Sequence, residues 1–373
     1  MTSHHLKWKQ LTIAISLAVS LLLVVTLLVG HSRVEAGWLN SISTGARSYL
    51  YRFDATAQTF FTIPLANGAV PTGLAMTGTN PTHVWIAEYG LNRITHVVFT
   101  DTAHYLQTVY PITSTAQSGP YRIAVAGNEV WFTERGANRV GRLNAVTGQL
   151  DEFYGHGLSS NAGLTDIKVA PDGAVWMGGQ TVQQLIKLTV SSPSVYAFTA
   201  YTDTLRPTFV VAPLYLAIEN SDLIWLTTPT VNYYKVAQFT PSSPDFVWPT
   251  LPGNLLMGVA ATPGFAWLAD LSGNEIDLVE VGTMTLASHF PITRPVEIAA
   301  ETSNLFWVTQ DDDRGAIGRL SYTNTVSYHV DSFAIPVPGL QLTGIAAAPA
   351  GGVWFSAYAL ERVYLPLVLK NFH

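Results

Sequence analysis

Short apolar runs alternate with polar turns along most of the chain. One run in each unit contains a tryptophan, and a second apolar run precedes it, such as RIAV ahead of Trp131. The tryptophan recurs at spacings of 40 to 49 residues, at Trp85, Trp131, Trp176, Trp225, Trp267, Trp307 and Trp354. A period of roughly 45 residues, with several short strands in each unit, is typical of the blades of a β-propeller.

Turn residues repeat as well. Four of the seven positions that follow the tryptophan by seven residues are asparagine: Asn92, Asn138, Asn232 and Asn274. Asparagine suits a turn because its side chain bonds its own backbone and because it tolerates positive φ. Apolar residues two positions later, such as Ile94, predict a third strand. We expect four strands in each unit, with both faces of every sheet covered by neighbouring blades.

The two ends of the chain are expected to share one blade. The last unit has two recognisable strands, LTGIAAAP from Leu342 and GVWFSA around Trp354. Residues 48–65 contain SYLYRFDAT and TFFTIPL, which fit a third and a fourth strand, and RVYLPLVL near the C-terminus is another candidate for the third. Closure would leave no exposed sheet edge. The sequence predicts an all-β fold, a seven-bladed β-propeller of four-stranded blades closed circularly by N- and C-terminal strands.

Composition narrows the function. The chain has 373 residues, of which 12% are charged and 48% hydrophobic, with a net charge of −6. This charged fraction is about half the usual one of roughly 25%. Without clusters of lysine and arginine we expect no nucleic-acid partner. The absence of cysteine excludes disulfides, thiol catalysis, zinc–thiolate sites and a lipoprotein anchor.

The chain begins with a targeting segment. A basic start at Lys7 precedes an uncharged run from Leu11 to Val29, and a small-residue cleavage motif ends at Ala36. We expect residues 1–36 to be a signal peptide. The alternative is an uncleaved anchor, because the run could just span a bilayer. Both place residues 37–373 outside the cytoplasm, secreted or at the cell surface.

These boundaries divide the chain into a signal peptide or anchor at 1–36, a propeller at 37–360 and a C-terminal segment at 361–373. The last segment, with VYLPLVLKNFH, resembles a short apolar tail of secreted proteins in some bacteria. It is expected to be a sorting tail or, alternatively, the last blade strand. We expect a monomer that touches a membrane only through an uncleaved N-terminal segment.

Two stretches, PYRIAVAGNEVWFTERGANRVGRL and HVWIAEYGLNRITHV, resemble the repeat of the streptogramin lyase (virginiamycin B lyase) family. The resemblance implies a seven-bladed propeller and an enzyme that opens a cyclic depsipeptide by elimination at its ester. It also implies a magnesium ion held by acidic residues in the central channel, with a histidine as acid or base. In the family a histidine follows a proline in the first strand, and Glu-x-His ends a second strand.

The chain departs from this pattern at both places. The residues after proline are Thr72, Tyr121 and Val296. The Glu-x-His positions are Glu88-Tyr89-Gly90 and Glu134-Arg135-Gly136. Glutamate is kept in both and histidine in neither.

The position three residues after the tryptophan is the candidate site. It carries Glu88, Glu134 and Asp270. One interpretation is a rim of carboxylates around the channel mouth, which could hold a hard cation such as magnesium, with Glu88 and Glu134 also as catalytic candidates. The other is that the strand ends meet water there, and that each carboxylate accepts N–H groups of the following turn.

We therefore expect an extracytoplasmic propeller that binds a carbohydrate, a peptide or a protein through its loops and has no lyase activity. The alternative is a metal-assisted lyase that uses Glu88 and Glu134. A histidine from another blade within about 5 Å of either glutamate would favour the enzyme, because proton transfer needs such proximity. A third hypothesis is a structural surface protein held by its C-terminal segment.

Overall fold

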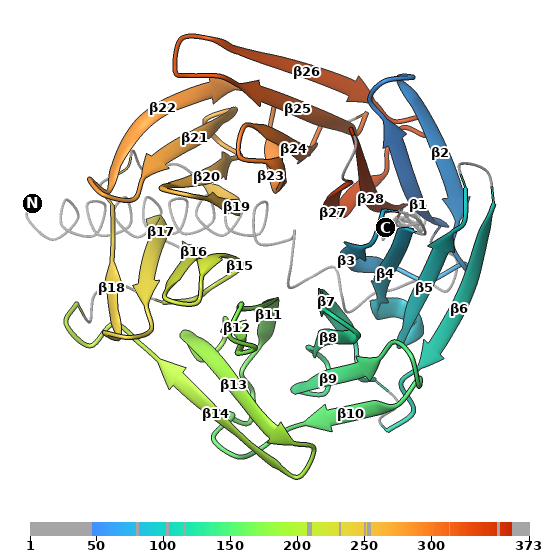
Figure 1. Cartoon of the computed structure of the whole chain (residues 1–373), viewed down its shortest axis with the longest axis vertical. Helices are drawn as coiled ribbons and strands as arrows, with labels where there is room; N and C mark the ends of the chain where they lie inside the picture. The colour runs from blue at the N-terminus through green and yellow to red at the C-terminus, as the bar shows by residue number, and fades with distance from the viewer. Residues whose placement is uncertain are drawn as a thin grey trace, which may run out of the picture. The chain divides into compact units, whose positions relative to one another are not determined.

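The computed structural model describes residues 47–359 apart from 80–81, 102–103, 115–116, 207–210, 231–232, 250, 252–254, 313 and 349–350. Within these residues the chain forms seven four-stranded antiparallel sheets arranged as blades around a common axis (Figure 1). The predicted seven-bladed β-propeller is thereby confirmed. The only helix in this part of the chain is a single 3-10 turn, η1 (Tyr89–Leu91).

The first four blades follow one another along the chain. Blade 1 has β3 (Pro71–Thr77), β4 (Thr82–Glu88), β5 (Arg93–Phe99) and β6 (Tyr105–Pro111). Blade 2 has β7 (Pro120–Ala126), β8 (Glu129–Glu134), β9 (Arg139–Asn144) and β10 (Leu150–Phe153). Blade 3 has β11 (Leu164–Val169), β12 (Val175–Gly179), β13 (Gln184–Ser192) and β14 (Val195–Tyr201). Blade 4 has β15 (Tyr215–Asn220), β16 (Leu223–Thr230), β17 (Tyr233–Thr240) and β18 (Asp245–Val247).

Three blades complete the ring. Blade 5 has β19 (Leu256–Thr262), β20 (Phe265–Asp270), β21 (Glu275–Glu280) and β22 (Thr285–Pro291). Blade 6 has β23 (Pro295–Thr302), β24 (Leu305–Gln310), β25 (Ala316–Tyr322) and β26 (Tyr328–Ala334). Blade 7 has β27 (Gln341–Ala348), β28 (Gly352–Ala359), β1 (Arg47–Asp54) and β2 (Thr59–Pro64).

Blade 7 closes the ring as the sequence predicted. Its strand order is β27-β28-β1-β2, and β1 pairs with β28 in a register that sets Tyr51 opposite Phe355. The N-terminal strand therefore takes the third place, which the sequence left open between two candidates. The segments at 1–36 and 361–373 lie outside the described residues. No helix that the structure describes is long and apolar enough to cross a membrane.

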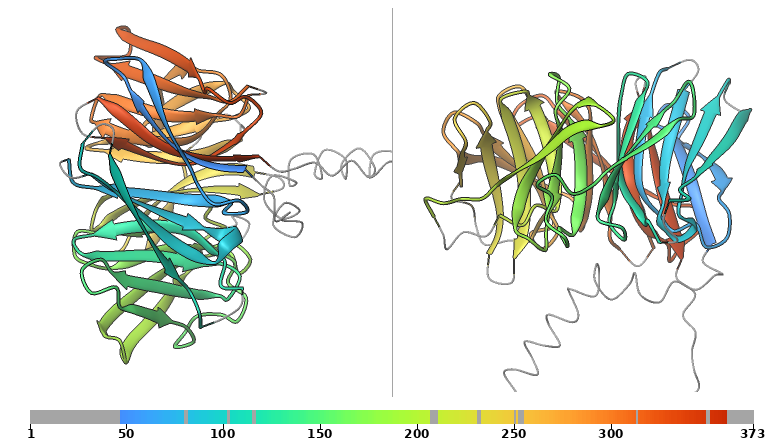
Figure 2. Two further views of the ribbon diagram at one scale, coloured as in Figure 1. Left: turned by 90° about the vertical axis from the view of Figure 1, so that its right-hand side faces the viewer. Right: turned by 90° about the horizontal axis from the view of Figure 1, so that it is seen from below.

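The first strand of each blade lies nearest the axis (Figure 1). In side view the strands run between the two faces of the ring (Figure 2). We call the side at which the first strands begin the front face. Because neighbouring strands are antiparallel, the second strands end at this same face, as the register partners Pro71 and Glu88 illustrate.

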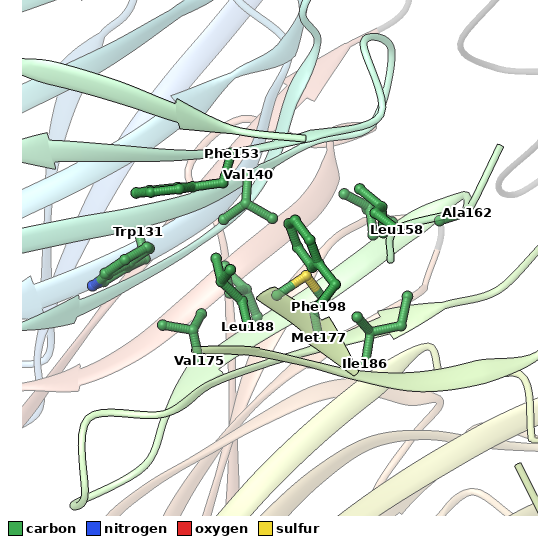
Figure 3. Packing of buried hydrophobic residues seen from close by; sticks show 12 residues of the cluster. Trp131, Val140, Phe153, Leu158, Ala162, Val175, Met177, Ile186, Leu188 and Phe198 are labelled. Atoms are coloured by element: carbon green, nitrogen blue, oxygen red, sulfur yellow. The ribbon is translucent and has the colours of Figure 1, made fainter. Parts of the chain in front are cut away.

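The ladder tryptophans lie between blades. All seven are buried, with at most 6% of their surface exposed. Trp131 of blade 2 packs with Val175 and Leu188 of blade 3 (Figure 3), and Trp354 of blade 7 packs with Leu74 and Val84 of blade 1. At 150–250 Å² of burial and roughly 25 cal/mol per Å², each contributes about 4–6 kcal/mol of gross hydrophobic free energy.

Threonine hydroxyls, all of them buried except that of partly buried Thr343, also join several blades to the next. They donate to backbone carbonyls of the following blade, from Thr72 to Pro120, Thr133 to Thr165, Thr165 to Pro213, Thr227 to Met257 and Thr343 to Pro71. The last of these bonds, at 2.6 Å, crosses from blade 7 to blade 1. Each bond stabilises the ring by about 1 kcal/mol.

The asparagine turns behave partly as predicted. Asn92, Asn138 and Asn274 have φ values of 54°, 56° and 58°, which confirms the left-handed turn. The predicted bond to the residue's own backbone is wrong for Asn138. Its side chain donates to Ser159 O and accepts from Ala162 N, both at 2.8 Å. These two residues lead into blade 3, so the turn residue links one blade to the next.

Candidate functional site in the central cavity

A cavity of about 360 Å³ lies on the axis of the ring, lined by the first strands of all seven blades. Most of its wall is made of small or aliphatic residues. Five polar side chains face it: Arg122, Asp166, Lys168, Tyr215 and Glu297. The chemistry that the cavity can offer depends on these five.

Strand irregularities place the acidic and arginine side chains in this wall. The register of the first and second strands shifts between Pro120 and Ile123 in blade 2, between Leu164 and Ile167 in blade 3, and between Pro295 and Ile298 in blade 6. Arg122, Asp166 and Glu297 are residues of these bulges. A bulge leaves its extra residue outside the regular ladder and turns its side chain.

Arg122 and Glu297 form an ion pair across the axis. Arg122 Nη1 lies 2.7 Å from Glu297 Oε1, and Nη2 lies 3.3 Å from the Tyr215 hydroxyl oxygen. The guanidinium carbon is 5.0 Å from the Tyr215 ring centroid and 5.3 Å from that of Tyr121. Burial lowers the pKa of Arg122, but Glu297 and the surrounding groups raise it by more, so the arginine stays charged.

A second ion pair lies in blade 3. Lys168 Nζ donates to both carboxylate oxygens of Asp166, at 2.9 and 2.8 Å, and the Leu216 N–H of blade 4 donates to Asp166 Oδ2 at 2.9 Å. Asp166 is buried, whereas Lys168 is partly exposed. The cavity therefore presents charges of both signs.

The sequence contains a signal for these residues that the prediction missed. Arg122, Asp166 and Glu297 lie nine or ten residues before the ladder tryptophan of their blade. Gly258 and Gly344 lie at the same spacing in blades 5 and 7, and Gly73, twelve residues before Trp85, follows a proline by two residues as Arg122 and Glu297 do. A Cβ on Gly73 would come within 2.8 Å of the Arg122 Cα atom. Glycine therefore lets the first strand of blade 1 approach the bulge that carries Arg122.

Glu88 lies at the end of β4 and is fully buried, so the strand end does not meet water as one interpretation proposed. Its Oε2 lies 2.5 Å from Arg93 Nε, and its Oε1 accepts the Thr95 hydroxyl at 2.7 Å. Glu88 is absent from the wall of the cavity. Its surroundings suit an ion pair inside one blade better than a magnesium ion.

Glu134 occupies the same place at the end of β8 and is also fully buried. Ser118 donates a hydrogen bond to its Oε2, whereas its Oε1 has no partner. Burial raises the pKa of Glu134 to about 8; the neighbouring Glu152 adds to the rise, and Ser118 and Arg139 oppose it. A carboxyl that holds its proton at pH 7 is a poor ligand for magnesium.

Asp270, the third predicted residue, ends β20 and is fully buried too. The structure groups it with Glu275 and Asp277 of the same blade: one ligand oxygen from each lies within 4.8 Å of the others. Burial and, to a smaller extent, the charges of Asp270 and Glu275 together raise the pKa of Asp277 to about 7. Among the described residues, Glu88 and Glu134 belong to no such group of three.

No described histidine lines the cavity. His83 and His96 contact each other through ring nitrogens 2.9 Å apart, and His104 and His329 pair with aspartates at the surface. The His156 ring lies 4.5 Å from that of Tyr196. None of them is a hydrogen-bond partner of Glu88 or Glu134 in the part of the chain that the structure describes.

Comparison with known proteins identifies the fold. No protein-family model matches the sequence, and no curated protein matches it significantly. A crystal structure of virginiamycin B lyase from Staphylococcus aureus is similar, with a TM-score of 0.63 and 19% identity over 83% of this chain and 99% of that one. The architecture expected from the repeat resemblance is therefore confirmed.

Other propellers are similar to a lesser degree. A putative 6-phosphogluconolactonase from Bacteroides uniformis has a TM-score of 0.57 and 12% identity over 83% of this chain and 99% of that one. AztD from Citrobacter koseri has a TM-score of 0.54 and 11% identity over 84% of this chain and 99% of its own. Identities this low show a shared fold, and function has to be argued from the site.

Proposed function

We propose that this chain is an exported binding propeller without lyase activity, which takes a small ligand with both acidic and basic groups, such as a short peptide, into its central cavity. The observation that carries this proposal is the Arg122–Glu297 pair across a hollow of about 360 Å³. Such a volume is within the range of small-molecule sites, roughly 300–1,000 Å³.

The charges of the cavity match such a ligand. Arg122 and Lys168 can bind a carboxylate, while Glu297 and Asp166 can bind an ammonium group. The aliphatic wall between them, which includes Ile123, suits an apolar side chain. A peptide with free ends carries one carboxylate and one ammonium group. These two groups can take the place of the internal partners of the charged side chains in the cavity.

The Arg122–Glu297 pair is not needed to stabilise the fold. Two buried charges lose hydration, and a well-packed apolar pair of similar volume is often equally or more stable. The seven blades already hold together through tryptophans and threonine hydroxyls. We therefore assign the charged pair to recognition.

The lyase alternative draws less support from the geometry. Glu88 is engaged by Arg93 and Thr95, and Glu134 holds its proton at neutral pH. The residues lining the cavity include no histidine that could act as acid or base. The likeness to virginiamycin B lyase concerns the fold. Export rests on the N-terminal sequence, with its uncharged run from Leu11 to Val29.

Calorimetric titration of the purified protein with dialanine tests the proposal, with maltose as an uncharged carbohydrate probe. We expect heat of binding with dialanine and none with maltose. In the double variant Arg122→Met/Glu297→Met the dialanine heat should disappear, while the fold remains because both charges are removed together.

Arg142→Gln is a matched control, because Arg142 pairs with Asp151 outside the cavity. It should bind dialanine as the wild type does. Binding of maltose alone would favour a carbohydrate ligand instead. No heat with dialanine, or equal heat in the double variant, would show that the cavity does not bind peptides.

A further inference from the structure

Three carboxylates gather on one face of blade 5. Asp270 and Glu275 are register partners at the end of β20 and the start of β21, and Asp277 follows Glu275 by two residues, opposite Leu268. Side chains two residues apart in a strand point to the same face of the sheet. Residues 270, 275 and 277 therefore converge, with one oxygen of each inside 4.8 Å.

The same three places in blades 1 and 2 carry a different charge pattern. Glu88 of blade 1 is opposite Arg93, and Glu134 of blade 2 is opposite Arg139. In both blades an arginine stands where blade 5 has Glu275. Blade 5 therefore keeps the buried carboxylate at the strand end and reverses the charge of its partner.

Two carboxylate oxygens of this group have no hydrogen-bond partner among the described residues. Asp270 Oδ1 accepts Gly273 N–H at 2.7 Å and the Ser272 hydroxyl at 3.2 Å, whereas Asp270 Oδ2 and Asp277 Oδ1 accept no hydrogen bond from any described residue. Both residues are almost fully buried, at 0% and 1% exposure. A buried carboxylate oxygen without a partner is costly. The turn holds Asp270 through its other oxygen, Oδ1.

The turn also leaves room beside the carboxylates. A Cβ on Gly273 would lie 2.6 Å from Asp270 Oδ2 and 3.0 Å from Glu275 Oε1. The corresponding residues of blades 1 and 2 are Leu91 and Ala137. Only blade 5 of these three has a glycine there, next to the oxygens that lack partners.

We propose that Asp270, Glu275 and Asp277 bind a divalent cation of the calcium or magnesium type. Both ions prefer carboxylate oxygens, and water can complete their coordination. Glu275 is partly exposed, which gives the cation a way in from solvent. The bound cation replaces the arginine of blades 1 and 2 and holds the strand ends of blade 5 together. This site is independent of the peptide cavity.

Thermal unfolding of the purified protein, first freed of metal with a chelator, tests the proposal. Calcium or magnesium chloride at millimolar concentration is the probe, with sodium chloride at equal ionic strength as the control for screening. We expect a divalent-specific rise in the unfolding midpoint on the order of 5 °C, since a ligand at 100 times its Kd stabilises the folded state. The larger of the calcium and magnesium shifts identifies the preferred ion.

Glu275→Arg is the decisive variant, because it gives blade 5 the charge pattern of blades 1 and 2. We expect it to fold and to lose the divalent shift. Asp277→Asn, a smaller change, should reduce the shift as well. A wild type without a divalent-specific shift would overturn the proposal, and so would a shift of equal size in Asp277→Asn.

Discussion

The strand-end position three residues after the tryptophan shows how one buried acidic residue can be accommodated in different ways. Glu88 is neutralised by Arg93 within its own blade. Glu134 instead keeps its proton, because burial raises its pKa to about 8. Asp270 lies in a cluster of carboxylates. Glu88 and Glu134 both stand opposite an arginine, but Arg139 pairs with Glu152. The state of the buried carboxyl therefore depends on which contacts its neighbours make, and the residue type at this position does not fix it.

The protonated state of Glu134 predicts a pH dependence of stability. Its pKa is higher in the folded chain than in the unfolded one, so between pH 4.5 and about 8 the folded state binds more protons. The free energy of unfolding must then fall as pH rises through this window. Glu134→Gln is neutral at every pH and should gain stability relative to the wild type by on the order of 2–4 kcal/mol from pH 5 to pH 9.

Urea unfolding of both proteins at several pH values measures this difference. Comparing wild type with variant removes the contribution of other titrating groups, Asp277 among them. A constant difference between the two proteins from pH 5 to pH 9 would mean that Glu134 is ionised throughout.

At the scale of the element, the turn between the second and third strands does more than reverse the chain. Asn138 combines a left-handed backbone with two hydrogen bonds to the segment that leads into blade 3. Asn92 does the same between blades 1 and 2, donating to Ile112 O and accepting from Gly119 N. These turns help to set the spacing between neighbouring sheets.

Replacing Asn138 should separate its two roles. Asn138→Gly keeps the left-handed conformation and loses both bonds, at a cost of about 1–2 kcal/mol in the free energy of unfolding. Asn138→Ala loses the bonds and also strains the backbone, which raises the cost to about 2–4 kcal/mol. Urea unfolding with an unchanged m-value measures both.

Gln183 provides the control. It occupies the same turn position of blade 3 with φ of 57°, and its side chain forms no hydrogen bond among the described residues. Gln183→Ala should therefore change stability little. Equal losses in Asn138→Gly and Asn138→Ala would show that backbone conformation contributes nothing at this turn.

At the scale of the whole ring, closure depends on a strand pair taken from the N-terminal end. β1 is paired on both sides, with β2 and with β28. Tyr51 and Phe53 of β1 are buried, and Tyr51 stacks on Phe355 at a centroid distance of 5.1 Å. Without β1 and β2, blade 7 would consist of only β27 and β28.

A chain that begins at residue 66 should therefore fail to fold, whereas one that begins at residue 46 should fold. Each buried aromatic lost costs about 3–5 kcal/mol, against a total stability of about 5–15 kcal/mol. Moving residues 47–65 to follow residue 359 through a short turn should restore the fold, because Arg47 and Ala359 are register partners. Soluble yield and circular dichroism report the result.

A stable short chain, or a circular permutant that stays unfolded, would contradict the role of blade 7 in closure.

The repeated features of this molecule could be predicted from the sequence, and the unrepeated ones could not. Seven tryptophans at spacings of 40 to 49 residues predicted the blades and their packing, because each faces a similar environment. Arg122 and Glu297 each belong to a single blade and are not repeated in the others. They meet only because the ring places blades 2 and 6 across from one another. Their contact depends on the diameter of the ring, which no local pattern encodes.

The carboxylate cluster lies between these cases. Asp270 was predicted as a candidate ligand, but its expected partners were the equivalent residues of other blades. The structure places those residues in separate sheets and brings in Glu275 and Asp277 from the adjacent strand. An alignment of the repeats shows glutamate in place of arginine, in SGNEID of blade 5 against GANRVG of blade 2. The participation of Glu275 could therefore have been predicted from the sequence.

The placement of β1 also has a mechanical consequence. A protein held to a surface through the residues ahead of Arg47 would transmit any pull straight into this strand, along its length. Because β1 is laddered to β28 at eight successive positions and to β2 at six, a pull along the strand loads those hydrogen bonds together in shear rather than one after another. Strand pairs loaded in shear resist a pulling force better than pairs that are opened one hydrogen bond at a time. The ring would therefore be held by its closing blade, in the direction in which that blade is strongest.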